Sequence, residues 1–153
     1  MAKSNYPPDR NLQKRAVQYF QALSELNDFQ LQKYGEVLID LGQFSEAEAV
    51  LRRVTSLHSD AFASYRLSQA RLGQGDADEA LFLIDAAIEG LDETKQKFAA
   101  SFWAHRFKVR QARAESHAVE DLDKAIAACE PGKYRMYLEN QRQNMPQEMK
   151  AKS

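Results

Sequence analysis

Apolar residues recur along the chain in a three-position pattern that fits one face of an α-helix. Each copy holds a small residue, a bulky apolar residue four positions later, and an apolar residue three positions beyond that. The copies are Ala16, Phe20, Leu23; Ala47, Leu51, Val54; Ala80, Ile84, Ala87; and Ala118, Leu122, Ala125, the first being the weakest. Neighbouring copies begin 31, 33 and 38 residues apart. Such a period predicts stacked helix pairs, because one pair cannot bury its apolar face alone.

The apolar spacing predicts a row of helices and no strand. The predicted helices cover residues 12–26, 29–41, 45–57, 60–72, 77–90, 97–112, 118–130 and 133–144. Residues 11–144 are therefore expected to form one helical domain, with helix pairs at about 28–59, 60–92 and 97–130. We expect residues 1–10 to be disordered and residues 145–153 to form a flexible tail.

Local signals mark where several of these helices begin and end. Gly42 and Gly75 follow the first helices of the first two pairs and suit helix C-termini. The helices that come next are predicted to open with the capping-box patterns Ser45/Glu48 and Asp76/Glu79. The turn before Ala118, which opens the fourth copy of the apolar pattern, contains no glycine, so the register of the third pair stays open.

Composition narrows the classes of partner. The 153-residue chain has a formal net charge of −1, which gives no bulk attraction to nucleic acid. No apolar run approaches the ~20 residues of a membrane span, and the polar N-terminus does not read as a secretory signal. The single cysteine, Cys129, fits a reducing compartment. These features predict a cytoplasmic protein that neither inserts into membranes nor binds nucleic acid.

Two segments carry a resemblance to a known family. The segments "LGQFSEAEAVLRRVTSLHSD" and "GDADEALFLIDAAIEGLD" are similar to tetratricopeptide repeats (TPR) in their turn glycines and in the spacing of their alanines. The resemblance covers about residues 28–130 and implies an all-α, right-handed solenoid of antiparallel helix pairs. An extra N-terminal helix and a C-terminal capping helix would complete it. Arg71, Ser59 and Asp92 depart from the family pattern.

The resemblance also implies a concave groove lined by the first helix of each pair. The matching positions are Phe29, Gln32, Glu36 and Ile39 in the first pair, and Phe62, Tyr65, Gln69 and Leu72 in the second. In the third pair, taking Ala104 as the close-packed small residue after a longer turn places Ser101, His105, Lys108 and Val109 in the groove. The competing register would place Trp103 and Phe107 there, with Arg106 in the tight helix crossing, and is less favoured.

The aromatic residues in this set have two interpretations. Phe62, Tyr65 and Leu72 either line the groove or pack between neighbouring helices, and the sequence does not separate these alternatives. The lysine, asparagine and arginine clamp with which some TPR proteins grip a chaperone C-terminus is absent, because Gln32, Glu36 and Gln69 occupy matching positions. A co-chaperone of that kind is therefore disfavoured.

The sequence holds no pattern that predicts catalysis, a metal site or a cofactor. His58, His105 and His117 lack metal-ligand spacing. Arg106, Arg110 and Arg113 form a basic stripe at helical spacing, which either meets an acidic partner or is balanced by Glu115, Glu120 and Asp121.

We therefore expect a non-enzymatic protein that binds a protein or peptide segment. The leading hypothesis is a TPR chaperone or adaptor that holds an apolar segment of its partner. In length and layout it resembles the small chaperones of bacterial secretion systems. The alternative is a structural scaffold subunit of a larger assembly, docked through the convex face or the last helix. A homodimer is compatible with either hypothesis, and the ligand's conformation, helical or extended, stays open.

Overall fold

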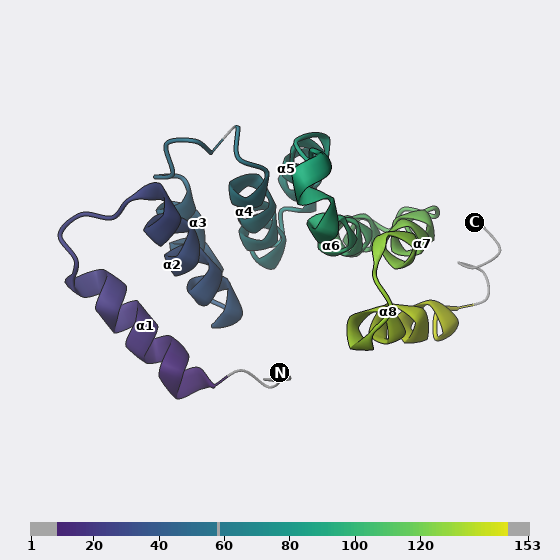
Figure 1. Ribbon diagram of the computed structural model, residues 1–153, viewed down its shortest axis with the longest axis horizontal. Coiled ribbons are helices and arrows are strands. Elements are labelled where there is room, and N and C mark those ends of the chain that lie inside the picture. The colour runs from purple at the N-terminus through teal and green to yellow at the C-terminus, as the bar shows by residue number, and fades with distance from the viewer. Residues whose placement is uncertain (1–8, 58, 147–153) are drawn as a thin grey trace.

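The computed structural model describes residues 9–57 and 59–146, and this part of the chain consists of helices joined by turns and loops, with no strand. The helices follow one another along the longest axis, from α1 at one end to α7 and α8 at the other (Figure 1). They are α1 (Arg10–Ala22), α2 (Asp28–Asp40), α3 (Phe44–Leu51), α4 (Ala61–Gly73), α5 (Ala77–Glu89), the 3-10 helix η1 (Glu93–Phe98), α6 (Ala99–Ala112), α7 (Val119–Ala128) and α8 (Lys133–Gln143).

The helices pack as sequential pairs. α2 packs on α3, α4 on α5 and α6 on α7, and the pairs are joined by contacts of α3 with α4 and of α5 with α6. In addition, α2 contacts α4 and α4 contacts α6, so that the first helices of the three pairs lie side by side. The predicted all-α architecture is confirmed for the described residues.

Side chains ahead of the helices satisfy the first backbone N–H groups. Asp60 and Asp76 cap α4 and α5. The capping box predicted for Asp76 and Glu79 forms only in part: Asp76 accepts from the N–H of Glu79 at 3.0 Å, whereas the Glu79 carboxylate accepts from Arg52. Asn27 forms a full capping box with Gln30 at the start of α2, a pattern that we did not predict.

The capping box predicted at Ser45 is wrong. α3 already begins at Phe44, behind Gln43, so Ser45 lies inside the first turn and its hydroxyl is not at the cap position. α3 also ends at Leu51 rather than near residue 57, and turns follow it. Val54 and Leu57 in these turns are still buried in the first pair's core.

The same turn ends the first helix of all three pairs. At Gly42 and Gly75 the chain adopts positive φ values of 78° and 89°. The following N–H of Gln43 donates to Leu38 O at 2.8 Å, and that of Asp76 donates to Arg71 O at 3.0 Å, as in a Schellman motif. Ala114 takes the equivalent place in the third pair.

Ala114 is the only non-glycine residue in the described part of the chain with a positive φ, 58°. Its own N–H donates to Gln111 O at 2.9 Å, and the N–H of Glu115 donates to Arg110 O at 3.0 Å. The third turn therefore repeats the first two without a glycine. The connection to α7, residues 113–118, is three residues longer than residues 41–43 and 74–76, which confirms that the third pair has the longer turn.

Small residues let the paired helices approach closely. Ala47 and Ala80, the small residues of the apolar pattern, are fully buried. A Cβ on Gly35 would lie 2.6 Å from side-chain atoms of Leu51, so only glycine fits there without a shift. Ser68 is fully buried, and its hydroxyl donates to Ala80 O at 2.7 Å. These contacts fix α2 on α3 and α4 on α5.

The two ends of the chain differ. α1 has no fully buried residue and rests on the core through Val17 and Phe20. At the other end, Leu138 and Met145 are buried in the core of the third pair. Met145, expected in the flexible tail, therefore belongs to the packed part. Residues 1–8 and 147–153, which hold the rest of the predicted flexible ends, lie outside the described residues.

Candidate binding surface

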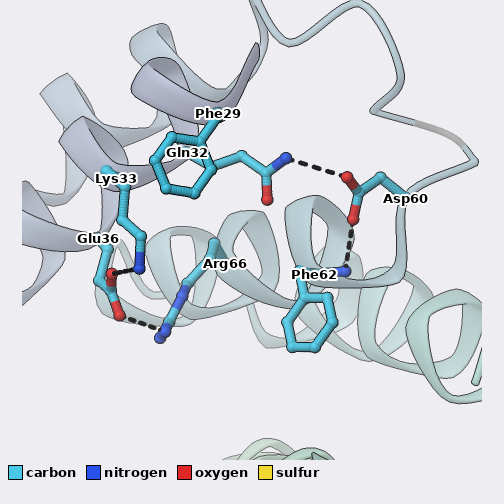
Figure 2. Close-up of a pocket in the computed structure, with 7 residues that line it drawn as sticks. All are labelled: Phe29, Gln32, Lys33, Glu36, Asp60, Phe62 and Arg66. Atoms are coloured by element: carbon cyan, nitrogen blue, oxygen red, sulfur yellow. Dashed lines mark hydrogen bonds and ion pairs between the residues drawn. The ribbon is translucent and has the colours of Figure 1, made fainter. Parts of the chain in front are cut away.

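A shallow pocket of about 300 Å³ lies where α2 meets the start of α4. Figure 2 shows the side chains that line it, which come from both helices and from the N-cap of α4. They are Phe29, Gln32, Lys33, Glu36, Asp60, Phe62 and Arg66. Four of them, namely Phe29, Gln32, Glu36 and Phe62, are among the predicted groove residues.

The helix starts position the polar side chains of the pocket. The capping box that opens α2 fixes the register in which Phe29, Gln32 and Glu36 share one face. Asp60 caps α4 through Oδ1, which accepts from the N–H of Phe62 at 2.9 Å. Its other oxygen, Oδ2, accepts from Nε2 of Gln32 at 3.0 Å. This bond ties the middle of α2 to the N-terminus of α4.

The charges of the pocket are paired with one another. Glu36 accepts from Nζ of Lys33 at 3.4 Å and from Nη2 of Arg66 at 2.5 Å, as Figure 2 shows. The remaining charge, Asp60, is held by backbone N–H groups and an amide. Two cations and two anions line the pocket, so it carries no net charge, and its selectivity has to come from shape and hydrogen bonding.

Phe29 is the apolar side chain that the pocket leaves uncovered. It is 68 % exposed, with Nζ of Lys33 5.7 Å from the ring centroid. Burial of a phenylalanine ring is worth roughly 1.5–3 kcal/mol, and no part of the described chain provides it here. The ring is therefore available to a partner.

Phe62 and Tyr65 belong mainly to the packing of α4 against η1 and α6. Phe62 meets Phe98 edge to face, with ring centroids 4.7 Å apart, and Tyr65 stacks on Phe102 at 4.5 Å. Both are half-buried, and burial raises the pKa of Tyr65. Of the two interpretations offered for them, packing between helices describes most of their surface, although Phe62 also reaches the pocket wall.

The remaining groove positions of the first two pairs do not line the pocket. Ile39 packs against the first core cluster. Gln69 accepts from Arg66 at 3.0 Å and donates to the hydroxyl of Tyr65 at 3.2 Å. It therefore holds Arg66, a pocket residue, without lining the pocket itself. Leu72 is half-buried and does not reach it.

His105, the predicted groove residue of the third pair, is buried instead. It is only 5 % exposed, and its Nε2 lies 2.8 Å from the hydroxyl of Ser68. Burial, helped by the positive charges of Lys108 and Arg66, lowers its pKa to about 3. The ring stays neutral at pH 7 and joins α4 to α6 without being offered to a ligand.

The register expected for the third pair is right in part. Ala104 and Phe107 are buried as predicted, and Trp103 packs against the same core. Val109 was expected in the groove but is fully buried, because α6 is covered by neighbours on more of its circumference than α2 is. Ser101 is half-buried and Lys108 is exposed.

Sequence reasoning missed three of the pocket residues, Lys33, Asp60 and Arg66. A signal for two of them was present. Phe29 and Lys33 stand four residues apart, as do Phe62 and Arg66, and the two pairs are 33 residues apart, which is the separation of the second and third alanine patterns. An aromatic residue with a cation one turn later thus recurs at the spacing of the apolar pattern.

The predicted basic stripe is balanced within the chain. Arg106 bonds Asp85 at 2.6 Å and Asp121 at 2.8 Å, and Arg110 bonds Glu115 at 2.9 Å and Asp121 at 3.2 Å. Arg113 pairs with Glu115 at 2.5 Å and also with Asp78. Asp121 is fully buried. Of the two interpretations, the second is right: acidic side chains of the same chain pair with these arginines, although Glu120 is not among them.

The described residues define an all-α protein of eight α-helices packed in sequential pairs. No family model, curated protein or solved structure matches this chain. Among the residues that the structure describes, no three His, Cys, Asp or Glu side chains are grouped to hold a metal ion. In the same part of the chain, no helix has the length and apolarity to cross a membrane.

Proposed function

We propose that the chain is a TPR-like helical repeat that binds a segment of another protein on the face shared by α2 and α4. In this proposal the three helix pairs form a right-handed solenoid. The molecule acts in the cytoplasm as a chaperone or adaptor, of the general kind that serves bacterial secretion systems, and performs no catalysis. The bound segment is apolar and places a large side chain against Phe29.

The equivalence of the helix pairs supports the repeat. Their first helices end in the same Schellman hydrogen bonds, at Gly42, Gly75 and Ala114. The alanines of the first two second helices, Ala47 and Ala80, are both fully buried at the crossing. Side-by-side contacts of α2, α4 and α6 are also those that a solenoid makes between its first helices.

The exposed ring of Phe29 beside a rim of paired charges and amides carries the binding proposal. Interfaces obtain most of their energy from a few aromatic anchors, while surrounding polar groups exclude water and fix the partner's position. Gln32 still has its amide oxygen available to a peptide N–H, since its Nε2 is the atom used by Asp60.

The test is affinity capture from a lysate of the source organism, with wild type beside Phe29→Ala. The matched control is Phe82→Ala, which removes a ring that is 73 % exposed on α5, away from the pocket. Phe62 and Tyr65 are less suitable because truncation would also disturb their packing on α6. A protein partner lost with Phe29→Ala and kept with Phe82→Ala supports the proposal. A partner kept by both variants contradicts it.

One observation favours the alternative, a scaffold subunit. α8 exposes Tyr134, Met136 and Tyr137, and the rings of the two tyrosines stack with their centroids 6.3 Å apart. A scaffold docked through the last helix would lose its assembly on Tyr137→Ala and keep it on Phe29→Ala. The same capture experiment therefore separates the two functions.

A further inference from the structure

We propose that α1 of one copy of this protein docks against α5 of a second copy, with the two helices antiparallel. The surfaces involved are separate from the pocket between α2 and α4. They are the exposed face of α1, formed by Leu12, Arg15 and Tyr19, and the exposed face of α5, formed by Phe82, Asp85 and Glu89.

α1 is a basic helix with an uncovered apolar face. Arg10, Lys14 and Arg15 are its charged residues, with no acid in the helix, and they form no ion pair with any residue that the structure describes. Leu12 and Tyr19 are 63 % and 58 % exposed and stand on either side of Arg15 at helical spacing. One side of α1 rests on α2, while this face has no partner within the described chain.

α5 has the complementary character. It contains the acids Asp78, Glu79, Asp85 and Glu89 and no basic residue. Phe82 is exposed among Asp78, Asp85 and Glu89, which recur on the same face at intervals of three or four residues. Asp78 and Asp85 are partly neutralised by Arg113 and Arg106, whereas Glu89 has no ion pair with a described residue. Glu89 is therefore the strongest acceptor on this face.

The helix dipoles favour the antiparallel arrangement. Arg10 is the first residue of α1, where the dipole is positive, and Glu89 is the last residue of α5, where it is negative. At these two positions the helix's own dipole opposes the charge, whereas Asp78 and Glu79 lie in the first turn of α5, where the dipole favours them. A partner helix of opposite charge, running the other way, relieves both conflicts.

The register follows from the apolar residues. When Tyr19 lies opposite Phe82 in an antiparallel pair, Arg15 falls level with residue 86, between the carboxylates of Asp85 and Glu89. Leu12 then falls level with Glu89, against the aliphatic part of that side chain. Both helices are 13 residues long, and in this register residues 12–22 of α1 lie opposite residues 89–79 of α5.

The experiment is sedimentation equilibrium of the full chain at low and at high salt, as a function of concentration. Wild type is expected to associate, more weakly as salt rises because exposed charges are screened. Arg15→Glu and Glu89→Arg are each expected to lower the association constant by about tenfold or more, because like charges then meet. An equimolar mixture of the two variants is expected to associate again, since the glutamate introduced on α1 and the arginine introduced on α5 can pair across the contact.

Arg53→Glu is the control, because it reverses an exposed cation that lies outside both surfaces. Circular dichroism checks that each variant is folded. Phe82→Ala tests the apolar part independently, and it should weaken association whereas Phe29→Ala should not. A monomeric wild type, single variants that associate like wild type, or a mixture that stays monomeric would each overturn the proposal. None of these results bears on partner binding at Phe29, so the two proposals succeed or fail separately.

Discussion

In the second and third helix pairs, different residues form the same turn at the end of the first helix. After α4 the left-handed position is held by Gly75, and after α6 it is held by Ala114. Both turns nevertheless make the same two backbone hydrogen bonds. An alanine in this conformation costs roughly 1–2 kcal/mol. The hydrogen bonding of the helix end therefore decides the geometry, and glycine only lowers its conformational cost.

The two pairs also share an arginine near the turn and differ in its surroundings. Arg71 bonds Asp76 at 2.5 Å, and Arg110 bonds Glu115 five residues on at 2.9 Å. In the second pair the arginine also reaches partly exposed acids, whereas in the third it reaches the fully buried Asp121. The third pair thus holds its longer turn through an ion-pair network with a buried centre.

The largest expected loss of stability comes from a charge placed where the two helices of the second or the third pair cross. Ala80→Glu and Ala125→Glu each bury an unpaired carboxylate, because both alanines are fully buried, and each should cost about 3–5 kcal/mol of unfolding free energy. Thermal and urea unfolding measure the loss. Ala86→Glu and Ala127→Glu, on the exposed sides of the same helices, are the controls. If the buried and the exposed variants were equally stable, Ala80 and Ala125 would not both lie where the helices of their pair cross.

Asp121→Asn and Asp76→Asn compare how much the ion-pair networks of the third and second pairs contribute to stability. Asp121→Asn removes the buried anion that Arg106 and Arg110 share, and we expect a loss of about 3 kcal/mol. Asp76→Asn in the second pair should cost less, because that carboxylate is partly exposed and asparagine still caps α5. Urea unfolding of both variants tests the contrast. A larger loss for Asp76→Asn would place the main network in the second pair instead.

His105 links the two pairs and should make their interface sensitive to acid. Its pKa falls to about 3 in the folded protein, below the ordinary value near 6.5, so unfolding takes up a proton between these values. Its contribution to stability is complete above pH 6.5 and is lost as pH falls, by about 2 kcal/mol between pH 7 and pH 5. In His105→Gln, urea unfolding should show a smaller loss over this range. An unchanged pH dependence would contradict the burial.

The smallest effect concerns the turn itself. Ala114→Gly should raise the free energy of unfolding by about 1 kcal/mol, because glycine adopts a φ of 58° without strain. Gly75→Ala, the converse change in the second pair, should lower it by a similar amount. Differential scanning calorimetry can resolve shifts of this size. A destabilised Ala114→Gly variant would show that the third turn is not a Schellman motif.

The sequence predicted the helices well because their signals are local. Apolar periodicity, the caps at Asp60 and Asp76 and the turn at Gly42 each depend on residues only a few positions apart. Ala114 gave no such signal, since an alanine shows no preference for a positive φ. The place of the third turn was nevertheless readable from Arg110 and Glu115, which repeat the spacing of Arg71 and Asp76.

The candidate site was less predictable because it depends on contacts between helices. Phe62 and Tyr65 fit a groove by spacing alone, but aromatic partners from η1 and α6 cover much of them. His105 is buried because Ser68 lies opposite it, 37 residues earlier in the chain. Phe29, at the end of the row of first helices, has no such partner and is exposed.

The most direct test of partner binding on the α2 and α4 face is photocrosslinking in cells. A photoreactive phenylalanine analogue replaces Phe29 in one variant and Phe82 in another, two rings of similar exposure on different faces. We expect position 29 to crosslink to one partner protein of a different sequence, and position 82 not to do so. The same partner at both positions, or no partner at position 29, would contradict it.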